Sequence, residues 1–294
     1  HLMQQLTEYD FTQEVQEDIL KGVYQELINL ETRHALGEYY TPDWLCEKIL
    51  ASLPLQTDSY LLDPACGSGS FLRAAIAQLR QDFPTLSATQ LTRQVVGIDI
   101  HPLSVQIAKT TILLALSELI RQAKQPVTLN VYLANSLLLP VGKTAKEEGQ
   151  ESIWKLIWQN SYPSVFLKGR FDVVMGNPPW LTYADVTNAS YQQELYELAH
   201  MYDLIPKSKA NLANLEIAAI FLAYSVNYFL KTNGSLALVL PRSVLTADQH
   251  DNTRSGQAKG FELTAVWDLK EVFPLFRVPA TVVFAKPSAK PARS

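Results

Sequence analysis

The sequence is poor in cysteine and histidine and has no long apolar run. Its two cysteines, Cys46 and Cys66, cannot form a disulfide framework, which favours a reducing, cytoplasmic location. The five histidines are scattered along the chain, so we expect no metal site. No stretch approaches the roughly 18 uncharged apolar residues of a membrane span, so we expect no membrane contact. Hydrophobic residues nevertheless make up 47% of the chain, which excludes a disordered protein.

Positive charge is also scarce, because 25 Lys and Arg residues stand against 29 Asp and Glu residues, a net charge of −4. Taken alone, this balance argues against nucleic acid as a partner. The excess of negative charge is concentrated at the start of the chain, however. Residues 1–60 hold three basic and eleven acidic residues, whereas residues 241–294 hold eight basic and five acidic ones. Since DNA affinity depends on local phosphate contacts more than on total charge, a DNA-binding role stays open.

The chain divides into three parts of unequal length. Apolar residues recur at three- and four-residue intervals between 11 and 32, which predicts a helical N-terminal segment over 1–36. Its first three residues resemble a cloning remnant. Residues 37–286 alternate apolar runs with helical stretches, and we expect them to form one large α/β domain. Residues 287–294, rich in Pro, Ala and Ser, resemble a linker.

Short apolar runs predict seven strands, at 60–63, 94–100, 128–133, 171–175, 235–240, 263–269 and 280–285. Helical patterns precede or separate most of them, at 41–53, 70–80, 102–121 and 214–230. This alternation predicts a mostly parallel sheet with helices on both faces. The last two runs are too close for a right-handed crossover, so we expect an antiparallel hairpin at one edge. Two segments, 140–170 and 181–211, interrupt the pattern as long irregular insertions of the kind that often carry function.

The stretch DPACGSGSF at 63–71 follows the first strand and opens a helix, where open α/β sheets bind ligands. Gly67 and Gly69 would allow a ligand to approach the backbone. The third glycine of a dinucleotide site is replaced by Leu72, and the lysine of a phosphate loop is missing. Neither of those sites is therefore predicted, and a plain strand–helix turn remains an alternative.

Three further strand ends carry polar residues. Asp99 ends the second strand, where a carboxylate can accept both hydroxyls of a ribose or can cap the helix that follows. Asn135 and Ser136, after the third strand, offer a carbonyl and a backbone N–H suited to an adenine edge. The stretch NPPW at 177–180 follows the fourth strand, and its prolines form a rigid bend that can aim the Asn177 amide and the Pro178 carbonyl at one point. A rigid loop with a core tryptophan is the alternative.

Together these stretches resemble the motifs of class I, S-adenosylmethionine-dependent methyltransferases, in particular the gamma-ordered DNA methyltransferases that make N6-methyladenine. DPACGSGSF matches the family's D-P-x-C-G-S-G-x-F motif, and NPPW matches its catalytic N-P-P-[YFW] motif. GEYYTP at 37–42, GSLALVLP at 234–241 and VFP at 272–274 resemble further motifs. The resemblance covers about residues 36–286 and implies a Rossmann-like fold, S-adenosylmethionine as cofactor and double-stranded DNA as substrate.

The resemblance also implies which residues do the work. The implied catalytic residues are Asn177, Pro178, Pro179, Trp180 and Phe273. The implied cofactor-binding residues are Tyr40, Thr41, Pro42, Asp63, Ala65, Cys66, Gly67, Ser68, Gly69, Phe71, Asp99, Ile100, Asn135, Ser136 and Asn177. Asn135 stands where many relatives have Asp, and Trp180 stands where Tyr or Phe is commoner.

The mechanism that the resemblance implies agrees with this chemistry. If the Asn177 side-chain oxygen and the Pro178 carbonyl accept the two N6 hydrogens, the nitrogen lone pair is drawn out of conjugation and can attack the methyl group. An adenine in a duplex must first be flipped out and held between aromatic faces. Trp180 suits one face and Phe273 the other, and a core position is the alternative for Phe273, since an aromatic at a strand–loop junction often packs in the core.

Relatives read their DNA sequence with a separate target recognition domain, and no such domain is evident in this sequence. We therefore expect a catalytic fragment of a type IIG-like restriction-modification enzyme, which binds DNA weakly without its recognition domain or specificity subunit. Two alternatives remain open. The acceptor could be a protein glutamine or an RNA base, or the chain could be a non-catalytic scaffold that binds the cofactor.

Overall fold

The computed structural model describes residues 40–138, 167–272, 276 and 278–289. The predicted helix at 11–32, most of the insertion at 140–170, and Phe273 lie outside the described residues. The boundary proposed at 36 also lies outside them, and only residues 287–289 of the proposed tail are described, so both domain boundaries stay predictions.

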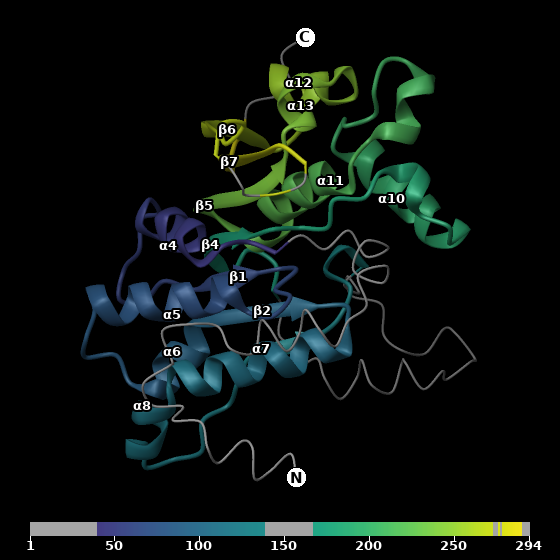
Figure 1. The fold of residues 1–294 in the computed structure, drawn as a ribbon. Helices are drawn as coiled ribbons and strands as arrows, with labels where there is room; N and C mark the ends of the chain where they lie inside the picture. Colours follow the sequence, from purple (N-terminus) through teal and green to yellow (C-terminus); the bar gives the residue numbers. More distant parts are fainter. Residues whose placement is uncertain (1–39, 139–166, 273–275, 277, 290–294) are drawn as a thin grey trace.

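A seven-stranded sheet with the order β3-β2-β1-β4-β5-β7-β6 forms the centre of the molecule (Figure 1). The neighbouring strands from β3 to β5 are parallel, and β7 runs antiparallel to both β5 and β6. The strands are β1 (Leu61–Asp63), β2 (Val95–Asp99), β3 (Val131–Leu133), β4 (Phe171–Gly176), β5 (Leu230–Pro241), β6 (Phe261–Asp268) and β7 (Ala280–Pro287). All seven predicted strands are confirmed, as is the antiparallel edge hairpin.

Helices cover both faces of this sheet, and each face has its own core. Alternation along β1 separates the two, because Leu62 packs into one core and Leu61 into the other. The first core lies against α10 and α11, and the second lies against α4, α5 and α7. These helices are α4 (Asp43–Ala51), α5 (Ser70–Asp82), α7 (Pro102–Ala115), α10 (Ala189–Met201) and α11 (Ile217–Tyr224). The predicted doubly covered α/β architecture is therefore confirmed.

The single long helix expected over 102–121 is wrong in detail. α7 ends at Ala115, and α8 (Ser117–Gln122) begins after Leu116, whose backbone leaves helical geometry at φ −110° and ψ 7°. The Leu116 side chain is fully buried in the second core. The Arg80 guanidinium of α5 donates to the Ala115 carbonyl at 3.1 Å. This bond gives a terminal carbonyl a partner outside the helix, so the chain can turn there.

The sequence pattern missed several short helices. α6 (Ala88–Gln94) begins with a capping box between Ser87 and Gln90, a signal that is present in the sequence. α10 lies inside the insertion expected to be irregular, and two further helices follow β5: α12 (Ser243–Thr246) and α13 (Asp251–Ser255). The predicted helix over 214–230 ends early, because α11 passes into a π-helical turn, Ser225–Phe229, that leads directly into β5.

Strands β1 and β4 lie side by side at the centre of the sheet, but the chain leaves them toward opposite faces. β1 continues into α5 on one face, whereas β4 leads to α10 and α11 on the other. Such a divergence opens a crevice at the carboxyl ends of parallel strands, where ligands of open α/β sheets bind.

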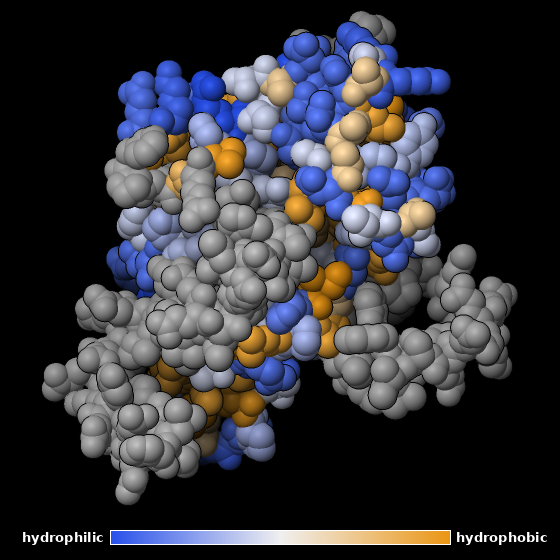
Figure 2. Space-filling model, turned by 45° about the vertical axis from the view of Figure 1, so that its right-hand side comes forward, coloured by the Kyte–Doolittle hydropathy of each residue, from blue (hydrophilic) through white to orange (hydrophobic). Residues whose placement is uncertain are grey.

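The surface view in Figure 2 shows a largely hydrophilic exterior in its upper part, with apolar side chains in small groups lower down. In the described ranges, no helix is long and apolar enough to cross a membrane. The exposed large apolar side chains include Ile100, at 59% exposure, which stands beside the crevice between β1 and β4.

Candidate functional site

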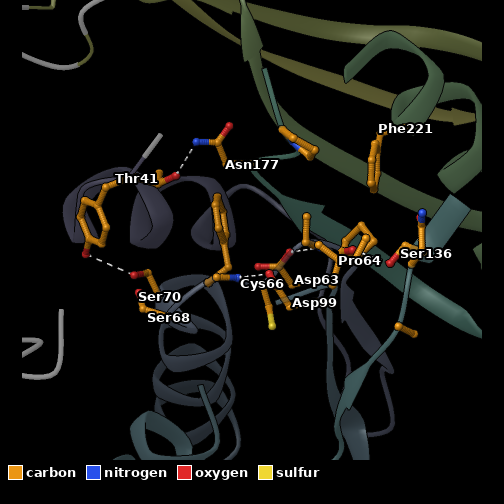
Figure 3. Close-up of a pocket in the computed structure, with 18 of the residues that line it drawn as sticks. Thr41, Asp63, Pro64, Cys66, Ser68, Ser70, Asp99, Ser136, Asn177 and Phe221 are labelled. Atoms are coloured by element: carbon orange, nitrogen blue, oxygen red, sulfur yellow. Dashed lines mark hydrogen bonds between the residues drawn. The ribbon is translucent and has the colours of Figure 1, made fainter. Parts of the chain in front are cut away.

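An open cavity lies in this crevice, with about 1050 Å³ of non-atom space that includes solvent at its mouth. The turns that follow β1, β2, β3 and β4 all contribute to its wall, together with residues from the segment before α4 and from helices α10 and α11. Figure 3 shows Asn177 and Thr41 at one end of the cavity and Ser136 and Phe221 at the other. A cavity of this size, lined by four successive strand ends, suits a ligand of nucleoside size or larger.

The turn after β1 is tight because of one glycine. Gly69 has a φ of +90°, and a Cβ at this position would lie 3.1 Å from the Cα of Ala108 on α7. Its backbone N–H donates to the Cys66 carbonyl at 2.8 Å. The left-handed conformation therefore lets α5 begin at once and pack closely on α7.

Two buried carboxylates meet below this turn. Asp99 accepts hydrogen bonds from the backbone N–H groups of Gly67 at 2.9 Å and His101 at 2.8 Å. It therefore ties the end of β2 both to the glycine turn and to His101, the N-cap residue of α7. Asp63 is 1% exposed and accepts from the Ala65 N–H at 3.1 Å.

Burial raises the pKa of both carboxyls. For Asp63 the pKa rises to about 8, because burial outweighs the hydrogen bond from Ala65, which lowers the pKa, and the charge on Asp99 adds a smaller increase. For Asp99 the bonds from His101 and Gly67 oppose the effect of burial, but its pKa is still raised. Because both side chains face the cavity, a cationic ligand there would favour their ionised forms.

A chain of polar contacts holds the segment before α4 over the start of α5. The Ser70 hydroxyl donates to the Tyr40 hydroxyl at 3.2 Å, and Tyr40 donates to Asp43 at 3.0 Å. Asp43 forms an ion pair with Arg73 of α5 at 3.0 Å. As a result, Tyr40 and Thr41 form part of the cavity wall although they precede β1.

The NPPW loop begins where β4 touches β1. A Cβ on Gly176 would lie only 2.5 Å from the Asp63 carboxylate oxygen, so a side chain cannot fit between the two strand ends. The next residue, Asn177, donates its amide N–H to the Thr41 hydroxyl at 3.1 Å. This bond orients the amide, because its nitrogen faces Thr41 and its oxygen takes the other side (Figure 3).

Trp180 lies beside the cavity and does not form part of its wall. Its indole N–H donates to the Val239 carbonyl of β5 at 3.4 Å, and its ring lies 5.0 Å from that of Phe276. It packs against both cores. Trp180 is therefore in part a core residue, as the alternative interpretation of the NPPW stretch expects.

The far end of the cavity is polar on one side and apolar on the other. Asn135 accepts the Leu137 N–H at 3.1 Å, and its side chain also bonds to the Tyr191 hydroxyl, which lowers the pKa of Tyr191 against the larger effect of burial. The Ser136 hydroxyl donates to the Pro64 carbonyl. Phe221 of α11 completes this end.

Most of the predicted cofactor residues lie together in the cavity wall. Those that line it are Tyr40, Thr41, Asp63, Ala65, Cys66, Gly67, Ser68, Phe71, Asp99, Ile100, Asn135, Ser136 and Asn177. Pro42 and Gly69 do not line it. Of the predicted catalytic residues, Asn177 and Pro179 line the cavity, Pro178 and Trp180 flank it, and Phe273 lies outside the described residues.

Five lining residues are absent from the predicted site: Pro64, Ser70 and Ala134, which lie next to predicted residues in the sequence, and Tyr191 and Phe221, which do not. Tyr191 lies on α10, in the insertion expected to be irregular, and Phe221 lies in a helix that is apolar all round, so its pattern resembles that of any core residue. In the part of the chain that the structure describes, no group of three His, Cys, Asp or Glu side chains could hold a metal ion.

The family model for the N-6 DNA methylases matches residues 15–286. The chain belongs to the N-6 DNA methylase family. It is 26% identical over 240 residues to the methylase subunit of the type I restriction enzyme MjaVIII from Methanocaldococcus jannaschii, covering 81% of this chain and 35% of the relative. The chain thus spans about a third of the length of this curated relative.

Two solved structures have the same fold. The DrdV–DNA complex matches 96% of this chain and 30% of its own with a TM-score of 0.65 at 18% identity. A protein of Listeria monocytogenes named as a class I S-adenosylmethionine-dependent methyltransferase matches 88% of this chain and 65% of its own, with a TM-score of 0.57 at 13% identity. The fold is therefore that of class I methyltransferases, which generally use S-adenosylmethionine.

The raised pKa of Asp63 makes stability depend on pH. With a folded pKa of about 8 and an unfolded value near 4, the folded protein binds one more proton than the unfolded chain between these values. The stabilisation from this carboxyl is complete below about pH 4 and is lost as the pH rises through 8, with a slope of at most about 1.4 kcal/mol per pH unit.

Asp63→Asn removes this dependence, so the variant should gain stability relative to the wild type as the pH rises from about 5 to about 8. Urea unfolding at several pH values measures the difference, with Asp58→Asn, at an exposed position, as the control. A difference between Asp63→Asn and the wild type that stays constant over this range would contradict a protonated Asp63.

Proposed function

We propose that this chain is the catalytic part of a restriction-modification DNA methyltransferase that methylates N6 of adenine with S-adenosylmethionine. The orientation of the Asn177 amide is the observation that carries the proposal. Thr41 accepts its N–H, which directs its oxygen away from Thr41, at one end of a cavity with two carboxylates in its wall. Membership of the N-6 DNA methylase family supports the same activity.

The residues of the cavity fit this cofactor. It carries two ribose hydroxyls, an adenine ring and positive charge on its sulfonium and ammonium groups, and when bound it supplies an electrophilic methyl group. Asp99 would accept the ribose hydroxyls, and the turn from Asp63 would hold the methionine part. Asn135 and Ser136, which line the cavity, would contact the adenine edge, and Ile100 and Phe221 would give it apolar neighbours.

The chain's own contribution to the reaction is a pair of fixed acceptors. The Asn177 side-chain oxygen and the Pro178 carbonyl each accept one hydrogen of the adenine amino group, which makes the nitrogen lone pair available for attack. Because Thr41 and the two prolines already hold these groups, little reorganisation is needed when the substrate arrives.

The target adenine has to leave the duplex to reach this point. Trp180 suits one face of the flipped base, since its ring is braced by Val239 and Phe276. Stacking on such a ring contributes about 1–3 kcal/mol per base. We keep Phe273 as the proposed second face.

Sequence recognition is assigned to parts of the system beyond these 294 residues. The chain spans about a third of its curated relative, which is a methylase subunit of a type I restriction enzyme. We propose that a target recognition domain or a specificity subunit holds the double-stranded DNA and that this part alone binds it weakly. Neither Cys46 nor Cys66 forms a disulfide, which suits a cytoplasmic location.

Labelled methyl transfer tests the activity. The full-length protein, given labelled S-adenosylmethionine with unmodified DNA, RNA or protein, is expected to label DNA alone and to yield N6-methyladenine. Label in RNA or at a protein glutamine would favour the alternative acceptors, and cofactor binding without any transfer would favour a scaffold.

Asn177→Ala should reduce methyl transfer by at least about 100-fold, since removing one preorganised hydrogen-bonding group typically has this effect. The Kd for S-adenosylmethionine, measured by calorimetry, should change less than threefold or so, because the acceptor acts on adenine. Asn233→Ala, at an exposed position of β5, is the matched control. Unchanged transfer in Asn177→Ala would overturn the assigned role.

Asp99→Ala should raise the Kd for S-adenosylmethionine by about 10- to 100-fold, because hydrogen bonds to a charged group contribute about 1.5–3 kcal/mol. Titration calorimetry measures the effect, and Asp82→Ala, an exposed carboxylate at the end of α5, serves as control. If Asp99→Ala binds the cofactor as tightly as the wild type, the ribose assignment is wrong.

A further inference from the structure

A cluster of three polar side chains, two of them buried, lies outside the cavity wall, beside the chain that follows the NPPW loop. Glu216 is 8% exposed and His250 is 1% exposed. One carboxylate oxygen of Glu216 accepts the Ser243 hydroxyl, and the other bonds to Nε2 of His250. We call Glu216, Ser243 and His250 the Glu216 cluster.

The Glu216 cluster joins segments that are far apart along the chain. Glu216 immediately precedes α11, Ser243 begins α12 just beyond the carboxyl end of β5, and His250 ends a short 3-10 turn, Asp248–His250. Burial acts to raise the pKa of Glu216, but the bond and charge of His250 hold that pKa below its usual value. The carboxylate therefore stays ionised and keeps both bonds.

The backbone of Glu216 is also paired with the chain that leaves the NPPW loop. Glu216 and Thr182 form an antiparallel bridge, only two residues after Trp180. The Tyr183 N–H donates to the Leu215 carbonyl at 2.8 Å, and the Ile217 N–H donates to the Leu181 carbonyl at 2.8 Å. The side chain of Glu216 thus holds the segment that follows β5, while the backbone of its two neighbours, Leu215 and Ile217, holds residues 181–183.

The Glu216 cluster does not have the geometry of a hydrolase site with a serine nucleophile. A serine nucleophile needs its hydroxyl on the histidine, whereas Ser243 donates to Glu216. Removing a partner from a buried carboxylate strongly destabilises the folded protein. The two bonds therefore hold the Glu216 side chain in one position. The Glu216 cluster thus fixes the backbone beside it, which includes residues 181–183.

We propose that Glu216, Ser243 and His250 are positioning residues, which fix the exit of the NPPW loop through the Thr182–Glu216 bridge and so set the place of Asn177 and Trp180 for transfer. This inference rests on the proposed methyltransferase function. Because the Glu216 cluster does not line the cavity, its loss slows the transfer step and leaves cofactor binding intact.

Ser243→Ala and Glu216→Gln test this in the full-length protein. Single-turnover transfer to unmodified DNA should fall about 5-fold in Ser243→Ala and at least about 20-fold in Glu216→Gln, since small displacements of a positioned group are costly. The Kd for S-adenosylmethionine should change less than about twofold in both, because the variants leave the cavity wall intact. Ser243→Thr, which keeps the hydroxyl, should restore most of the rate.

Amide hydrogen exchange reports the positioning directly. In Ser243→Ala, the Tyr183 and Ile217 amides should exchange faster than in the wild type, whereas amides in β1 and β2 should not change. Lys231→Met is the matched control, because the Lys231–Asp172 ion pair joins β4 and β5 at their other ends, far from the loop. It should leave both the rate and these two amides unchanged.

Wild-type transfer rates in both variants, or unchanged exchange at Tyr183 and Ile217, would overturn the inference. So would a Kd that rises in proportion to the loss of rate, because that result indicates a general loss of structure. If the wild-type protein methylates nothing, the proposed function fails separately, and exchange in Ser243→Ala still decides whether the Glu216 cluster holds residues 181–183.

Discussion

The contact between the ends of β1 and β4 is the constraint on which the site depends. The Asp63 carboxylate lies so close to Gly176 that a side chain cannot be accommodated there. The two strands therefore end side by side before the chain departs to opposite faces of the sheet. The turn that would hold the cofactor and the loop that would act on the substrate start from this one contact, so their separation is set by the sheet and not by flexible loops.

The same contact buries two carboxyls in a place that would suit a positively charged ligand. Asp63 is buried by the strand packing, with Asp99 beside it, and each ionised carboxylate in such a place costs free energy. A ligand with positive charge offsets that cost when it enters the cavity, because it favours the ionised form. Below about pH 8 Asp63 is protonated in the ligand-free protein, so a cationic ligand that favours the ionised form would displace this proton, and its affinity would weaken as the pH falls.

The sequence predicts the sheet and the residues at its strand ends well, for a physical reason. Buried parallel strands need continuous apolar runs, and the polar stretches after 63, 99 and 177 stand out against them. Helix α10 is not predicted, because only two of its residues, Leu195 and Ala199, are buried, and two apolar positions give a weak helical pattern. Phe221 is not predicted as a lining residue, because the sequence of an all-apolar helix does not indicate which side chain faces a cavity.

The Glu216 cluster could not be found from sequence at all, since its three residues are spread over 35 positions and belong to no local pattern. Yet these distant contacts are what make a short loop precise. Asn177 is held from the N-terminal side of the fold by Thr41, and the loop's exit is held by Glu216. Between these anchors the two prolines leave the backbone little freedom. A rigid loop with one anchor could still pivot as a unit, whereas two anchors from different segments remove that motion, and preorganised acceptors require its removal.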